Sequence, residues 1–181
     1  MESKNLMFRG DFRLKILFKN ISSVRTKKNQ LIVNFPEGEA IFYLGEKALK
    51  WAEKIKNPKS LIDKLGVKPD SKVAVVGVAD NEFLKQLNER TIMATGKLAK
   101  ELDFIFYAAE SLKELTKLSL LKECIKKSGA IWVVSLKGKN ANVKDVVVIK
   151  AAKDAGLVDV KVVSFSDTHT ANKLVIPISK R

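Results

Sequence analysis

Polar residues directly follow several β-rich stretches of the sequence, and at such positions an α/β protein gathers the groups that do chemistry. In an open α/β sheet, ligands bind beyond the carboxyl ends of the strands. The sequence therefore predicts a binding edge for a small molecule or a protein partner. Its residues are Gly77, Asp80 and Asn81 at the end of stretch 72–78, Tyr107 and Glu110 at the end of stretch 103–108, and Ser135 and Lys137 at the end of stretch 130–136.

Each of these residues also has an ordinary structural explanation. Asp80 has the residue type and position of a helix N-cap, because its carboxylate can accept from a free amide of the first helical turn. Ser135 is explained as a strand end, and Lys137 as a solvated loop charge. Both explanations stay open for the binding edge.

The only histidine, His169, lies in the hydroxyl-rich segment 164–170. A histidine titrates near neutral pH and can act as a general acid or base, here with Asp167 close by in the sequence. Short polar residues are equally what a hairpin turn requires, and no set of metal ligands surrounds this histidine. His169 and Asp167 are thus candidates for catalysis, with a structural or exposed histidine as the alternative.

The single cysteine, Cys124, has helical spacing with Leu120 and Leu121. That spacing favours a small buried hydrophobe over a nucleophile, and one cysteine forms no internal disulfide.

The elements that would position the binding edge alternate between strands and helices from about residue 59 to residue 181. Such alternation indicates a mostly parallel sheet with helices on both faces. Gly66, Gly129 and Gly156 are predicted to end helices. The predicted order is a short helix after Ser60, strand 72–78, helix 81–90, strand 91–95, strand 103–108, helix 112–127, strand 130–136, helix 143–155, strand 158–165 and strand 174–178.

Residues 1–58 have a different pattern and predict a small antiparallel β module with one helix. Four β-rich runs, 12–18, 21–26, 30–35 and 39–44, follow one another and indicate an antiparallel meander. Ala48, Trp51, Ala52 and Ile55 then have the spacing of an amphipathic helix, which Asn57 and Pro58 end.

Length and composition exclude several classes of protein. The chain has 181 residues, of which 46% are hydrophobic and 30% charged, so it can bury a proper core and is neither collagen-like nor disordered. No apolar run approaches the ~20 residues of a membrane span, and the first residues lack the pattern of a signal peptide. We therefore expect a cytoplasmic protein.

The net charge of +14 makes a polyanion such as nucleic acid a partner to consider. Only five of the 34 basic residues are arginine, and residues 1–60 carry 13 basic and 6 acidic side chains. No motif that reads bases is present, which weakens the case for nucleic acid. Two interpretations of the basic side chains therefore stay open, a solvated surface and a polyanion site. The densest candidates for such a site are Lys27, Lys28, Lys54, Lys56 and Lys59.

The segment Leu65-Gly-Val-Lys-Pro-Asp-Ser-Lys-Val-Ala-Val-Val-Gly77 resembles the opening of class I S-adenosylmethionine-dependent methyltransferases. Residues 102–107 are similar to the fourth strand of that family, residues 112–132 to the following helix, turn and fifth strand, and residues 156–178 to its terminal antiparallel hairpin. The resemblance covers residues 60–181 and implies a Rossmann-like fold. With its N-terminal module, the chain resembles uncharacterised prokaryotic proteins that carry a reduced version of this core.

The sequence departs from the family at the cofactor loop. Gly77 is followed by Val78, Ala79 and Asp80, so the second glycine is missing and a β-branched residue adds bulk next to the turn. Between Arg90 and Asp103 there is room for one short strand, whereas a βα unit with its next strand takes ~30 residues. These departures disfavour S-adenosylmethionine bound in the usual manner.

Three functions from different classes follow. The leading hypothesis is a non-catalytic binding or interaction protein on a degenerate methyltransferase-like fold. The alternatives are a small-molecule transferase with a modified pocket around Gly77, Tyr107 and His169, and a polyanion-binding protein that uses the N-terminal lysines.

Overall fold

The computed structural model describes residues 5–94, 99–138 and 141–181. The chain divides into two compact units, Met1–Ser60 and Leu61–Arg181. Among the described residues, no helix is both long and apolar enough to cross a membrane.

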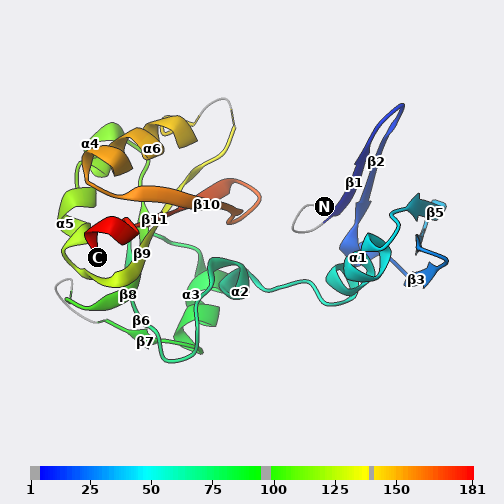
Figure 1. The fold of residues 1–181 in the computed structure, drawn as a ribbon, viewed down its shortest axis with the longest axis horizontal. Coiled ribbons are helices and arrows are strands. Elements are labelled where there is room, and N and C mark those ends of the chain that lie inside the picture. The colour runs from blue at the N-terminus through cyan, green and yellow to red at the C-terminus, as the bar shows by residue number, and fades with distance from the viewer. Residues whose placement is uncertain (1–4, 95–98, 139–140) are drawn as a thin grey trace. The chain divides into compact units, whose positions relative to one another are not determined.

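The N-terminal unit contains a hairpin, a three-stranded meander and one helix (Figure 1). The hairpin pairs β1 with β2, and the antiparallel meander has the order β3-β4-β5. The expected four-stranded meander is therefore wrong. The first of the four predicted runs, 12–18, forms β2, which pairs with the unpredicted strand β1 and not with β3. The elements are β1 (Asn5–Arg9), β2 (Arg13–Leu17), the 3-10 turn η1 (Phe18–Asn20), β3 (Ser23–Lys27), β4 (Gln30–Phe35), β5 (Gly38–Tyr43) and α1 (Lys47–Lys56).

The core of this unit lies between α1, the hairpin and one face of the meander. The helix buries Ala48, Ala52 and Ile55, as its spacing predicts, and Asn57 follows its last turn. These side chains pack with Leu6 and Ile16 of the hairpin, and with Leu31 and Val33 of β4.

The C-terminal unit is built on a six-stranded sheet of order β10-β11-β9-β8-β6-β7. Strands β7, β6, β8 and β9 run parallel to one another, and β11 runs antiparallel between β9 and β10. The elements are α2 (Leu61–Leu65), β6 (Lys72–Val76), α3 (Asn81–Asn88), β7 (Ile92–Met93), β8 (Leu102–Ala108), α4 (Leu112–Leu115), α5 (Leu118–Lys122), β9 (Ile125–Leu136), α6 (Asp145–Asp154), β10 (Val158–Ser164), β11 (His169–Val175) and the 3-10 turn η2 (Ile178–Lys180).

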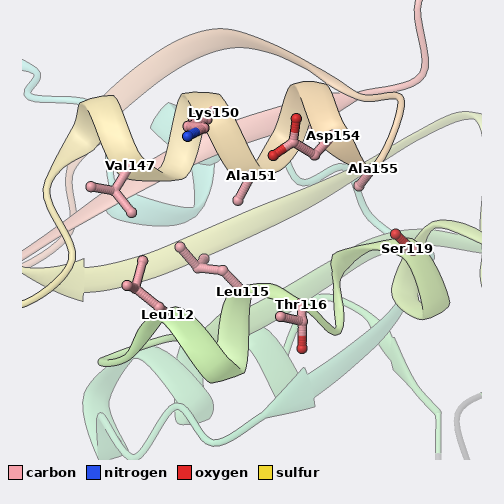
Figure 2. Close-up of a pocket in the computed structure, with 9 residues that line it drawn as sticks. All are labelled: Leu112, Leu115, Thr116, Ser119, Val147, Lys150, Ala151, Asp154 and Ala155. Atoms are coloured by element: carbon pink, nitrogen blue, oxygen red, sulfur yellow. The ribbon is translucent and has the colours of Figure 1, made fainter.

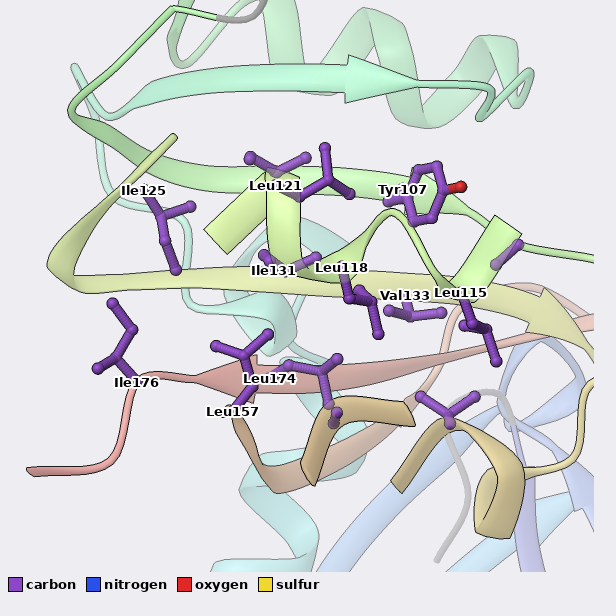
Figure 3. Close-up of a cluster of buried hydrophobic side chains, with 14 of the residues drawn as sticks. Tyr107, Leu115, Leu118, Leu121, Ile125, Ile131, Val133, Leu157, Leu174 and Ile176 are labelled. Carbon is purple, nitrogen blue, oxygen red and sulfur yellow. The ribbon is translucent and has the colours of Figure 1, made fainter. Parts of the chain in front are cut away.

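Helices cover both faces of this sheet, as the α/β alternation predicts. On one face, Leu115 of α4, Leu118 of α5 and Val148 of α6 pack against the strands (Figure 3). On the other face, Leu65 of α2 and Phe83 of α3 do so. The unit is therefore a Rossmann-like α/β unit with a mostly parallel sheet, as the sequence predicts.

The prediction of one continuous helix over residues 112–127 is wrong. The structure has two short helices there, and β9 already begins at Ile125. Nevertheless Leu115, Leu118, Leu121 and Ile125 all enter one core, as Figure 3 shows, because two short helices and a strand start can present the same side chains.

Gly129 does not end a helix but closes a bulge in β9. Leu102 of β8 pairs with Ile125 and Phe104 with Ala130, so the intervening residues of β9 bulge out of the ladder. A Cβ at Gly129 would lie 2.7 Å from the carbonyl oxygen of Leu102, which only a glycine avoids.

The predicted last strand, 174–178, is displaced. The strand observed is β11, which ends at Val175, and residues Ile178–Lys180 form the turn η2. Residues 169–172, of which all but Ala171 are polar, belong to the strand because β11 is paired on both sides. His169 accordingly opens a strand instead of lying in the connection.

Candidate functional site

The turn that follows β6 depends on Gly77. This residue has φ +76°, and a Cβ there would lie 3.3 Å from the Cβ of Ala108 at the end of β8. The left-handed backbone favours glycine, and the turn lies directly against the neighbouring strand end. Gly77 is exposed, so its backbone is accessible from this edge of the sheet.

The side chain of Val78 does not add bulk at that approach, contrary to the expectation from the sequence. It is buried and packs in the same core as Phe83 and Phe165. Although the second glycine is missing, the side chain of Val78 points into the core and leaves the backbone of the turn uncovered.

Asp80 caps α3, and Asn81 opens that helix. The Asp80 carboxylate accepts from the amide of Phe83 at 3.0 Å, which is the N-cap predicted from the sequence. Asn81 is exposed at the first helical position. Both residues directly follow the Gly77 turn in the sequence, and their part in a binding edge stays a prediction.

Tyr107 is buried at the end of β8 and does not line an open edge. Its hydroxyl donates to the carbonyl oxygen of Glu114 at 2.8 Å. Burial raises the pKa of Tyr107, and the negative charge of Glu114 adds to that effect. The tyrosine therefore fixes α4 beneath the edge and stays protonated at neutral pH.

Glu114, which the sequence reasoning missed, organises the turn after β8. Its carboxylate accepts from the amide of Glu110 at 2.7 Å and from the amide of Ser111 at 2.9 Å. The hydrogen bond from the Glu110 amide, with those from Ser111, lowers the pKa of Glu114. The signal was present, since Ser111 and Glu114 have the spacing of a capping box.

At the end of β9, Lys137 is engaged in the hairpin between β10 and β11. Its ammonium donates to the hydroxyl of Ser164 at 2.7 Å and to the carbonyl oxygen of Ser166. Ser135 is buried, and its Oγ has no hydrogen-bond partner among the described residues.

His169 lies within the same hairpin. Its Nδ1 is 2.8 Å from the hydroxyl of Thr168, and its backbone amide donates to Oγ of Ser166 at 3.0 Å. Asp167 is exposed in the intervening turn. These bonds hold the turn together, which agrees with the structural explanation of its polar residues.

The structure does not bring His169 and Gly77 together. Both lie at the edge where the parallel strands end, but β8 and β9 stand between β6 and β11. At the usual strand spacing of about 4.8 Å, three steps across the sheet separate them by about 14 Å. The edge at Gly77 therefore has Asp80, Asn81 and Glu110 as its candidate side chains, without the histidine.

The N-terminal lysines belong to different elements. Lys27 and Lys28 lie at the two-residue turn between β3 and β4, where Lys28 and Asn29 have positive φ. Lys54 and Lys56 lie in the last turn of α1, and Lys59 follows that helix.

Cys124 is half-buried against the core beneath α4 to α6, and its Sγ lies 3.6 Å from the carbonyl oxygen of Leu120. In the part of the chain that the structure describes, no three His, Cys, Asp or Glu side chains are grouped so as to hold a metal ion.

A cavity that the sequence reasoning missed lies between α4, α5 and α6 and has a volume of about 390 Å³. Figure 2 shows Leu112 and Leu115 directed toward α6, and Val147 and Ala151 directed toward α4. No sequence pattern predicts this cavity, because it depends on how the three helices pack over the sheet.

No protein-family model matches the chain, and no curated protein matches it. Among solved structures, a TehB-like S-adenosylmethionine-dependent methyltransferase from Corynebacterium glutamicum is similar with 12% identity and a TM-score of 0.45, over 72% of this chain and 96% of that one. A methyltransferase from Aquifex aeolicus has 15% identity and a TM-score of 0.44, over 69% and 93%. Magnesium protoporphyrin IX methyltransferase from Synechocystis has 10% identity and a TM-score of 0.44, over 64% and 78%. Likeness of this extent carries no argument about activity.

Proposed function

We propose that the chain is a methyltransferase-like transferase that binds its ligand at the edge of the sheet where β6 and β8 end. The observation that carries this proposal is the turn at Gly77. It is exposed, lies against Ala108 and is followed by a valine whose side chain is in the core. A backbone left open in this way supports close approach by a ligand that contains a nucleoside.

The residues at this edge fit part of S-adenosylmethionine, which when bound would supply a methyl group. The Gly77 turn and the start of α3 suit the approach of a nucleoside to the backbone. The usual ribose partner is missing, because the first carboxylate after β7 is Glu101, which directly precedes β8 at the opposite edge. Asn81 and Glu110 are the nearest polar side chains that can hold the ribose hydroxyls instead.

Calorimetric titration of the full chain with S-adenosylmethionine and S-adenosylhomocysteine tests the proposal. We expect saturable binding with a micromolar Kd, abolished by Ala79→Trp, because a large side chain at this exposed turn position blocks the approach. Asn88→Trp, at the exposed far end of α3, is the matched control and should bind as the parent does. Absence of binding by the parent chain would overturn the proposal.

One observation favours the second candidate, a non-catalytic binding protein. The Tyr107 hydroxyl and the Glu114 carboxylate are both occupied by internal hydrogen bonds. A thermal-shift screen separates the candidates, since a ligand at a hundredfold excess over its Kd stabilises by about 2.7 kcal/mol. Stabilisation by methyl donors supports the transferase, and a screen in which no nucleotide or methyl donor stabilises the chain supports the second candidate.

A further inference from the structure

The meander of the N-terminal unit has a second face that points away from its core. The pairing register places nine residues on it, and we call them the outer sheet face. Strand pairing aligns them in three rows, which are Lys27, Gln30 and Tyr43, then Arg25, Ile32 and Ile41, then Ser23, Asn34 and Glu39.

Two of the three apolar or aromatic residues on this face, Ile41 and Tyr43, are exposed, whereas Ile32 in the central row is buried. The side chain of Tyr43 is 80% exposed and that of Ile41 45%. Neither residue belongs to the core formed around Leu31 and Val33, whose side chains alternate with those of the outer sheet face along β4. An exposed aromatic group beside other apolar groups is a feature of surfaces that bind a partner.

The Tyr43 end of the outer sheet face is positively charged, and no ion pair neutralises its lysines among the described residues. Lys27 and Lys28 are exposed, and their ammonium groups have no hydrogen-bond or ion-pair partner among the described residues. The acidic member of the face, Glu39, is neutralised by Arg25, whose guanidinium lies 2.7 Å from its carboxylate. An anionic partner is therefore favoured, in keeping with the 13 basic and 6 acidic residues of segment 1–60.

We propose that the outer sheet face binds single-stranded RNA. A base stacks on the ring of Tyr43, and adjacent phosphates contact Lys27 and Lys28. Gln30 stands between Lys27 and Tyr43 in the same row, and its amide offers both a donor and an acceptor to a ribose 2′-hydroxyl. A lone aromatic ring among lysines and an amide suits a nucleotide better than a membrane, which would require a broader apolar surface.

Fluorescence anisotropy of a labelled 12-nucleotide RNA with the full chain tests this assignment. We expect saturable binding that weakens with salt, with a slope of log K against log salt of about −1.4 for two phosphate contacts. Tyr43→Ala should weaken binding roughly tenfold, and Tyr43→Phe should retain it, because stacking needs only the ring. Lys27→Gln combined with Lys28→Gln should bring the salt slope close to zero.

Matched controls lie on α1, which covers the opposite face of the meander. Leu49→Ala removes another exposed apolar side chain, and Lys54→Gln combined with Lys56→Gln removes two other exposed charges. These variants should bind as the parent does. Equal losses in these controls, unchanged binding by Tyr43→Ala, DNA of the same sequence bound as tightly as RNA, or binding to anionic vesicles instead of RNA would each overturn the proposal. The mutated residues belong to the N-terminal unit, so the outcome is independent of the titrations with methyl donors.

Discussion

Asp103 of β8 and Lys126 of β9 form an ion pair in which the carboxylate Oδ1 lies 2.6 Å from the ammonium Nζ. The other carboxylate oxygen accepts from the amide of Lys72, the first residue of β6, at 2.8 Å. One side chain thus ties three strands together at the edge where the parallel strands begin. The Lys126 side chain reaches it from the bulge of β9.

Asp103→Asn should lower the free energy of unfolding by about 1 kcal/mol at pH 7, because the ion pair is only partly shielded from solvent. Burial alone raises the pKa of Asp103, but the hydrogen bonds from Lys126 and the Lys72 amide, with their charges, outweigh it and lower the pKa below the ordinary 3.8. The stabilisation is therefore complete above pH 3.8 and is lost as the pH falls through the lower folded value. Urea denaturation between pH 2 and pH 7 should show the gap to the parent closing at low pH. The exposed Glu123→Gln should show no such gap.

Gly129→Ala should destabilise the chain by about 2 kcal/mol, because the added Cβ meets backbone that cannot move freely. The contacts are 2.7 Å to the Leu102 carbonyl oxygen and 3.1 Å to the Lys126 amide nitrogen. Urea denaturation measures the effect, with the exposed neighbour Ser128→Ala as control. A Gly129→Ala variant as stable as the control would contradict the tight bulge.

Asp80→Ala should cost about 1 kcal/mol of stability, whereas Asp80→Asn should cost little, because asparagine accepts the same hydrogen bond from the Phe83 amide. Thermal unfolding of the two variants measures this difference. If the carboxylate also contacts a ligand, Asp80→Asn should weaken the binding of methyl donors at unchanged stability. Equal losses of stability in both variants would argue against the cap.

Asp159→Asn should stabilise the chain at pH 7 and leave it unchanged below pH 3.8. Burial raises the pKa of Asp159, and the charge of Asp145 adds to that effect, against the weaker opposing influence of Asn172. A raised folded pKa means that stability is lost as the pH rises through it, and the neutral amide avoids that loss. The measurement is the melting temperature of the parent chain and of Asp159→Asn, from below pH 3.8 up to pH 7. A variant less stable at pH 7 would show that the ionised carboxylate is favourably bound.

The sequence predicts most core positions correctly, even where it predicts the wrong backbone. Leu115, Leu118, Leu121 and Ile125 are all buried together, although the expected single helix is two helices and a strand start. The spacing of apolar residues predicts which side chains are buried together, but more than one backbone conformation can bury the same set. The bulge at Gly129 depends on the contact with Leu102, which is distant in the sequence.

The candidate site was predictable only where the chemistry is local. The Asp80 cap follows from neighbouring residues, and so does the box formed by Ser111 and Glu114. Other features of the site depend on the order of the strands in the sheet, which a local pattern of residues does not determine. These are the burial of Tyr107 and the separation of His169 from Gly77.

The position of β11 determines when this sheet can be completed during synthesis. The strand follows both β9 and β10 in the sequence, yet it is the partner of each of them. Until residues 169–175 leave the ribosome, the apolar edge of β9, with Ile131 and Val133, has no neighbour on that side. A nascent chain paused before this point would present an open strand edge to other chains. By pairing on both sides, β11 covers one edge of β9 and one edge of β10 at the same time.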